Sequence, residues 1–143
     1  MKEESIFFFA EETLYQLRQR TELRIWLKAI ARKEKHTIAE LNYIFCSDDY
    51  LLQVNKDYLQ HDYYTDIITF DNSEETAHIE GDIFISIDRV KENAATHKTS
   101  MKDELHRVMA HGLLHLTGYK DKTPAEKALM RKKEDDALAL RRF

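Results

Sequence analysis

The sequence predicts one domain of the α+β class, containing four short strands and about five helices. Four stretches are rich in β-branched and aromatic residues, as strands are: 5–10, 37–46, 65–70 and 81–87. Five stretches combine helix-start signals or apolar residues at helical spacing: 21–35, 47–58, 88–97, 100–117 and from 123 onward. With 3 Gly and 1 Pro in 143 residues, the loops are expected to be short and the fold compact.

The N-terminal part is predicted to form a strand followed by a helix. Residues 6–9 are consecutive apolar side chains, a pattern that suits a short strand better than one face of a helix. Thr21 is expected to cap a helix that runs to about Lys35. The apolar stripe of this helix, which includes Trp26, is interpreted as core.

The middle of the chain is predicted to contain a strand, a helix and two further strands. After the strand at 37–46, Ser47 is expected to start a helix to about Tyr58, with acidic residues in its first turn where the helix dipole favours them. The strands at 65–70 and 81–87 are separated by a short polar segment, so we expect them to be antiparallel neighbours.

Three helices are predicted in the C-terminal part. Asp88 is expected to cap the first, which ends near His97. Ser100 followed by Asp103 is a capping-box signature for the second. The third begins at Thr123, where a capping box coincides with proline at the first helical position.

Composition and length indicate a single domain spanning residues 1–143. No apolar run approaches the ~20 residues that cross a bilayer, and the first residues lack the features of a signal peptide. Cys46 is the only cysteine, so no disulfide framework is expected. These features predict a cytoplasmic protein.

One segment is basic although the net charge is −4. Between Leu17 and His36 there are seven basic residues and two acids. We interpret this helix as a candidate phosphate-contacting patch that includes Arg24 and Lys28, with a merely solvated face as the alternative.

The strongest evidence for chemistry lies between residues 111 and 121. His111 and His115 are four apart on a predicted helix, so both imidazoles can bind one ion. Gly118 suits the end of that helix, after which Asp121 can supply a third ligand. Three protein ligands leave a fourth position open, as in catalytic zinc sites, and predict one zinc ion per chain. The alternative is a pair of packed histidines that bind no metal.

Two neighbours of the histidines predict how the helix packs. Gly112 lies in the apolar stripe, although glycine destabilises a helix by about 0.8–1.0 kcal/mol relative to alanine, so another backbone is expected to pack close to it. Leu114 points away from that stripe, so we expect the helix to be covered on both sides.

Three blocks of this sequence resemble the YbeY family of bacterial rRNA-maturation endoribonucleases. They are H-G-x-L-H-L-x-G-Y at 111–119, the pair 54–58 and 65–70, and Gly81-Asp82-Ile83. The resemblance implies a mixed four-stranded sheet with a zincin-like metal helix in the helical layer. Most members have a third histidine where this chain has Asp121, and a carboxylate ligand leaves room for divalent ions other than zinc.

The same resemblance implies a function. It predicts a zinc-dependent endonuclease specific for single-stranded RNA, acting in rRNA maturation, including processing of the 16S rRNA 3′ end, and in ribosome quality control. RNA and the ribosome are then its partners. The family usually has an arginine at the position of Leu59 and a proline at that of Tyr64. His61 or a nearby lysine is the candidate substitute for that arginine, with a solvated loop residue as the alternative for His61, and Thr65 is a further candidate for substrate binding.

The general base is not obvious from the sequence. Zinc peptidases of the H-E-x-x-H type use a glutamate that this chain replaces with Gly112. Asp66 and Asp82 are the candidates, because both are expected at the beginning of strands that flank the site. Two other classes remain open: a zinc peptidase or other hydrolase, and a non-catalytic ribosome-assembly factor.

Overall fold

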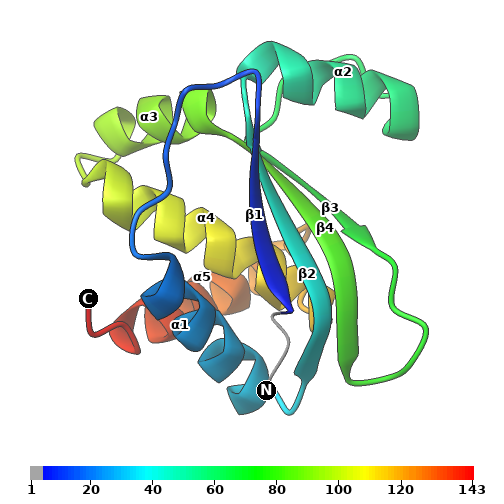
Figure 1. The fold of residues 1–143 in the computed structure, drawn as a ribbon, viewed down its shortest axis with the longest axis vertical. Coiled ribbons are helices and arrows are strands. Elements are labelled where there is room, and N and C mark those ends of the chain that lie inside the picture. The colour runs from blue at the N-terminus through cyan, green and yellow to red at the C-terminus, as the bar shows by residue number, and fades with distance from the viewer. Residues whose placement is uncertain (1–4) are drawn as a thin grey trace.

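A computed structural model describes residues 5–143 and contains a mixed four-stranded sheet (Figure 1). The strands are β1 (Ile6–Glu11), β2 (Thr37–Cys46), β3 (Ile67–Asp71) and β4 (His78–Ser86). Their order across the sheet is β1-β2-β4-β3. The pairs β1–β2 and β2–β4 are parallel, whereas β3 is antiparallel to β4, as its short connection predicted. The α+β class and the mixed sheet are therefore confirmed.

Five helices lie around this sheet: α1 (Arg20–Lys33), α2 (Asp48–Leu59), α3 (Ile87–Thr96), α4 (Met101–Leu116) and α5 (Pro124–Ala139). The larger core cluster joins one face of the sheet to α1, α3, α4 and α5 (Figure 1). A smaller cluster on the other face joins α2 to the sheet through Leu51, Val54, Cys46 and Ile68. In residues 5–143 no helix is both long and apolar enough to cross a membrane.

Local signals placed some elements accurately and missed the ends of others. The strand at 37–46 and the helix start at Ser47, whose hydroxyl accepts from the Tyr50 N–H, are confirmed. β4 begins three residues earlier than predicted, because His78 and Ile79 already pair with the first residues of β2. β3 is shifted to 67–71.

Two predicted helix caps are wrong. Thr21 lies inside α1, whose N-cap is Gln19 in the left-handed conformation (φ 59°) without a side-chain hydrogen bond. Asp88 lies in the first turn of α3, where its carboxylate accepts from the Asp48 N–H at 2.8 Å. The cap of α3 is the hydroxyl of Ser86. Both helices begin earlier than predicted: α1 because the left-handed backbone at Gln19 already turns the chain, and α3 because Ser86, at the end of β4, accepts from the Arg89 N–H.

The two predicted capping boxes, at Ser100 and at Thr123, differ from each other. Thr123 and Glu126 form a complete capping box at the start of α5. The Ser100 hydroxyl accepts from the Asp103 N–H at 3.0 Å, as expected. The Asp103 carboxylate, however, accepts from Arg141 at 2.8 Å, so a charged partner from the C-terminal segment holds this side chain.

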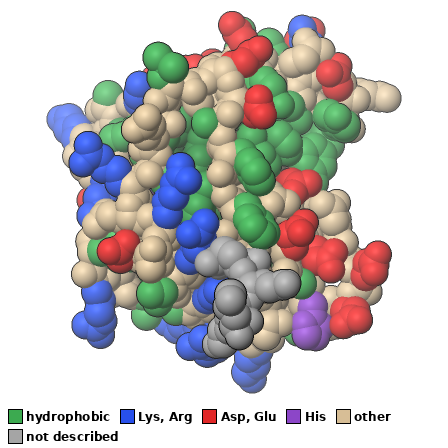
Figure 2. All heavy atoms as spheres, in the orientation of Figure 1, with side chains coloured by type: hydrophobic (Ala, Val, Ile, Leu, Met, Phe, Trp, Pro, Cys, Tyr) green, Lys and Arg blue, Asp and Glu red, His purple; other side chains and the backbone are tan. Residues whose placement is uncertain are grey.

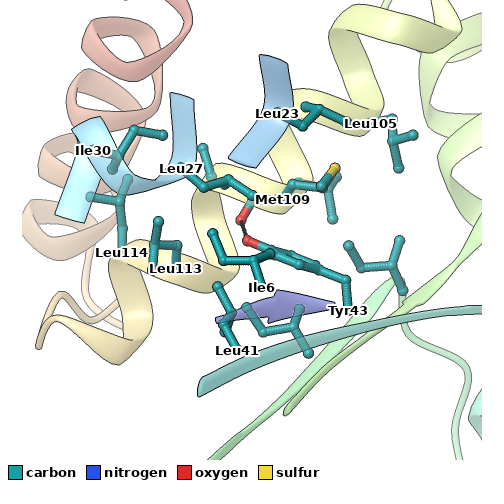
Figure 3. Packing of buried hydrophobic residues seen from close by; sticks show 14 of the residues in the cluster. Ile6, Leu23, Leu27, Ile30, Leu41, Tyr43, Leu105, Met109, Leu113 and Leu114 are labelled. Atoms are coloured by element: carbon teal, nitrogen blue, oxygen red, sulfur yellow. Dashed lines mark hydrogen bonds between the residues drawn. The ribbon is translucent and has the colours of Figure 1, made fainter. Parts of the chain in front are cut away.

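α4 packs tightly against the sheet and is covered on both sides. The Tyr43 hydroxyl of β2 donates to the Met109 carbonyl at 2.8 Å (Figure 3). A Cβ on Gly112 would lie 2.9 Å from a methyl carbon of Ile83, so the close neighbours of this glycine are side chains and not the predicted backbone. Leu114, on the other side, is buried beside Ile30 of α1 (Figure 3), as its position predicted.

Candidate metal centre

The last turn of α4 presents the two histidines, and the chain then reverses at Gly118. The rings of His111 and His115 lie 5.1 Å apart. Gly118 has φ 114°, and its N–H bonds to the His115 carbonyl while the Tyr119 N–H bonds to the Leu114 carbonyl. This pair of bonds is a Schellman motif, which glycine closes without a steric penalty. The predicted end of the metal helix is confirmed.

The loop that carries Asp121 is held at both ends. Before it, the Tyr119 hydroxyl donates to Glu34, the C-cap residue of α1, at 2.5 Å. After it, the N–H groups of Lys122 and Thr123 both donate to one carboxylate oxygen of Glu126. Asp121 is therefore presented by a short segment with fixed neighbours on either side.

The carboxylate of Asp121 reaches both histidines. Its Oδ2 lies 3.1 Å from Nε2 of His111 and 3.4 Å from Nε2 of His115. The three donor atoms all lie within 4.8 Å of one another. Ligands about 2.1 Å from a tetrahedral ion are roughly 3.4 Å apart, so this spacing fits one divalent cation.

A second carboxylate, which the sequence analysis missed, lies behind His111. Glu134 of α5 is buried, and its Oε2 accepts from Nδ1 of His111 at 2.6 Å. Its Oε1 accepts from Arg107 at 3.0 Å. Burial by itself lowers the pKa of His111, but the hydrogen bond to Glu134 and the charges of Glu134, Asp121 and Asp66 outweigh it and raise that pKa.

These residues line a pocket of about 430 Å³, much larger than a single ion needs. Its walls come from α3, α4, α5, the start of β3 and the Asp121 loop. The lining side chains include Thr65, Asp66, Asn93, His97, Glu104, Arg107, His111, His115, Asp121, Arg131 and Glu134. A ligand with a phosphate and neighbouring groups therefore has room beside the three metal-ligand candidates.

The two candidate bases are in very different places. Asp66 lines the pocket, and burial raises the pKa of its carboxyl against the opposing effects of backbone hydrogen bonds and His111. Asp82 was expected to flank the site, but it faces the other side of the sheet, where its carboxylate accepts from Asn42 at 3.0 Å. The reason is strand alternation: its neighbours Gly81 and Ile83 face α4, so Asp82 cannot.

The candidate substrate-binding residues also lie in different places, some in the pocket and some outside it. Thr65 lines the pocket, whereas His61 is exposed and stacks on Tyr63 outside it. Arg24 lies at the β1 edge, where its Nε donates to the Ile6 carbonyl, and β3 is at the opposite edge of the sheet. Lys28 is one turn further along α1. Figure 2 shows Lys and Arg side chains along the left and the lower part of the view, and those in the lower part lie over α1.

The sequence could have indicated some of the pocket residues that the sequence analysis did not identify. Glu104, Arg107 and His111 follow helical spacing, so they lie on one face of α4. Glu134 has no such signal, because it follows His111 by 23 residues and belongs to another helix. His97 joins the pocket through a 2.8 Å contact of its Nδ1 with Glu104.

The fold and the site together define an α+β protein in which three side chains are placed so that they could hold one metal ion, an arrangement of the kind used in hydrolysis. Residues 8–141 match the family model described as Endoribonuclease YbeY. The chain belongs to the YbeY family.

Similar proteins agree with this assignment. An Endoribonuclease YbeY of Cytophaga hutchinsonii is 72% identical over 143 residues, the whole of both chains. One of Parabacteroides distasonis is 46% identical over 136 residues, covering 95% of each chain. A Thermotoga maritima protein solved in solution has a TM-score of 0.65 and 26% identity, covering 93% of this chain and 86% of that one.

Proposed function

We propose that this protein is a zinc-dependent endoribonuclease that cleaves single-stranded RNA. The observation that carries the proposal is the convergence of His111, His115 and Asp121 on one point inside a pocket. Its relatives are named endoribonucleases, which supports RNA as the substrate. With a carboxylate among the ligands, Mn²⁺ or another divalent ion is an alternative to zinc.

The pocket residues have distinct tasks in this proposal. A divalent ion supplies Lewis acidity and a water molecule that is acidic near neutral pH. Asp66 accepts the proton of the attacking water, since its raised pKa brings a carboxylate closer to the pH at which a general base is efficient. Thr65 and the guanidinium of Arg131 at the pocket wall offer donors to phosphate oxygens.

The biological substrate proposed is ribosomal RNA in the cytoplasm. Maturation of the 16S rRNA 3′ end and ribosome quality control are the processes that the family membership suggests. In this proposal the basic face of α1, with Arg24 and Lys28, binds RNA that extends beyond the pocket. Because such binding acts by counterion release, replacing both residues with glutamine reduces the slope of log K against log salt by roughly one for each phosphate that is no longer neutralised.

The test combines metal content with cleavage of one labelled RNA in single-stranded and duplex form. Asp121→His is expected to keep zinc and cleavage, because imidazole is an equally good ligand. Asp121→Ala is expected to lose most of both. Equal zinc affinity in the His and Ala variants would exclude Asp121 as a ligand.

A matched pair of variants tests the base. Asp66→Asn should lower the cleavage rate by about 10²–10⁴-fold without loss of zinc, the usual range for a general base. Asp82→Asn removes the same charge on the other face of the sheet and should change neither quantity. Cleavage of peptides but not RNA would instead favour a peptidase, and zinc binding without any cleavage would favour an assembly factor.

A further inference from the structure

We propose that Glu134 is a positioning residue of the metal centre, and that Arg107 holds it in place. The inference concerns which nitrogen of His111 binds the ion, and it rests on the proposed metal site. Glu134 is not one of the three residues grouped as metal ligands, and it reaches that group through its hydrogen bond to His111, so we expect its effect on the ion to pass through that ring.

The contact geometry assigns the two ring nitrogens of His111 different tasks. Nδ1 donates to Oε2 of Glu134 at 2.6 Å, and Nε2 faces Oδ2 of Asp121 at 3.1 Å. A histidine whose Nδ1 carries the proton offers its lone pair at Nε2. Carboxylates in this position fix the tautomer and the ring orientation of metal-binding histidines and make the ligand nitrogen more basic.

Arg107 prevents Glu134 from turning away. Its Nη1 donates to Oε1 of Glu134 at 3.0 Å, and its Nη2 donates to Asp135 at 2.7 Å. Each carboxylate oxygen of Glu134 thus has its own partner. Arg107 and His111 are one turn apart on α4, so the two partners of Glu134 are held by the same rigid helix.

Burial makes this arrangement energetically demanding. The Glu134 side chain is 9% exposed and that of Arg107 20%. A buried charge pair gives little net stability over apolar residues of the same volume, because desolvation offsets the attraction. A purely structural link between α4 and α5 would not require a carboxylate that points at a metal ligand.

The experiment measures zinc affinity by competition with a chelator, on the intact protein. Glu134→Ala is expected to weaken zinc binding by about 10–100-fold, the usual range for removal of such a partner. Glu134→Gln should have a smaller effect, since its single amide oxygen can still accept from Nδ1, although it then loses the hydrogen bond from Arg107. Asp135→Ala is the control: it removes the adjacent acid and one hydrogen bond of Arg107 but not the hydrogen bond to His111, and it should leave the affinity within about threefold of wild type.

A second readout separates positioning from stability. Nitrogen-15 NMR of the zinc-loaded protein should show a protonated Nδ1 and a metal-bound Nε2 at His111 in wild type and in Glu134→Gln. In Glu134→Ala we expect a mixture of rings that bind the ion through Nε2 and rings that bind it through Nδ1. If the alanine variant does not fold, Glu134→Met, which keeps the volume without an acceptor, carries the same expectation.

The outcomes distinguish the two proposals. Undetectable zinc binding in wild type overturns the metal site itself. Tight binding in wild type with unchanged affinity and unchanged His111 tautomer in the alanine or methionine variant overturns only the role of Glu134.

Discussion

Two of the three histidines of α4, His106 and His111, lie five residues apart in opposite environments. His111 lines the pocket among the carboxylates of Glu134 and Asp121, and these raise its pKa despite burial. His106 is 3% exposed and packs against the rings of Trp26 and Phe143. Burial, followed by the nearby charges of Arg141 and Lys102, lowers the pKa of His106 to about 4.

The difference shows that the partner, and not the helix, decides what a histidine does. Nδ1 of His111 donates to the carboxylate of Glu134. Nδ1 of His106 accepts from the guanidinium of Arg141 at 2.9 Å, which requires a neutral ring. Both partners come from the C-terminal part of the chain, so α5 and the residues after it make one face of α4 ready for a cation and the other face part of the core.

The largest effect is expected from a substitution on the face of α4 that lines the pocket. His111→Ala should abolish tight zinc binding and lower RNA cleavage by about a thousandfold, equivalent to several kcal/mol of transition-state stabilisation. Elemental analysis and single-turnover cleavage are the measurements. Retention of one zinc per chain in this variant would contradict the assignment of the histidine as a ligand.

On the face of α4 that belongs to the core, a substitution should lower the free energy of unfolding. His106→Ala removes a ring packed against Trp26 and Phe143 and one acceptor of Arg141, and it should cost about 2–4 kcal/mol of unfolding free energy. Urea denaturation measures this decrease. Zinc content should remain that of wild type, and a fall in zinc content would show that the two sides of α4 are coupled.

The pH dependence of stability sharpens the contrast. The ordinary pKa of His106 is 6.5 and its folded pKa is about 4, so between these values the unfolded chain binds a proton that the folded protein does not. Stability from this residue is fully present above pH 6.5 and is lost as the pH falls toward 4. Lowering the pH from 7 to 5 should cost on the order of 2 kcal/mol.

The control for this effect is His106→Gln, which cannot titrate. Urea denaturation of both proteins between pH 4 and 8 isolates the contribution of the residue, because the other groups titrate in both. The difference in unfolding free energy should shrink as the pH falls, and a constant difference would mean that His106 is not held neutral.

The smallest expected effect concerns the loop that carries Asp121 to the histidines. Tyr119→Phe removes the hydroxyl that bonds to Glu34 but keeps the ring under Lys133, so it should cost about 1 kcal/mol. Zinc affinity should fall by less than tenfold. Tyr58→Phe, at an exposed tyrosine, is the matched control for both quantities.

Most elements of the fold were predictable because their signals are local. Ser47, Ser100 and Thr123 cap helices through bonds to residues three positions away, and strand composition located β2 without error. The starts of α1 and β4 were not predictable in this way. The first depends on the left-handed backbone at Gln19, and the second on pairing with a strand about forty residues earlier.

The candidate site also has features that local sequence signals set and features that only the fold sets. The sequence alone determined the histidine pair, the turn at Gly118 and the reach of Asp121, because helical spacing and a glycine C-cap act within a few residues. Strand alternation already indicated that Asp82 lies on the face opposite Ile83, but only the structure decided that α4 packs against the face of Ile83.

The pairing of Glu134 with Arg107 and His111 and the neutral state of His106 were decided by tertiary structure alone. Each depends on side chains from α5 or the C-terminal segment meeting α4 across 23 to 35 positions in the chain. Burial there makes a charge or a missing hydrogen-bond partner costly, so the identity of the partner sets the protonation and orientation of each histidine. No local pattern of residues contains that information.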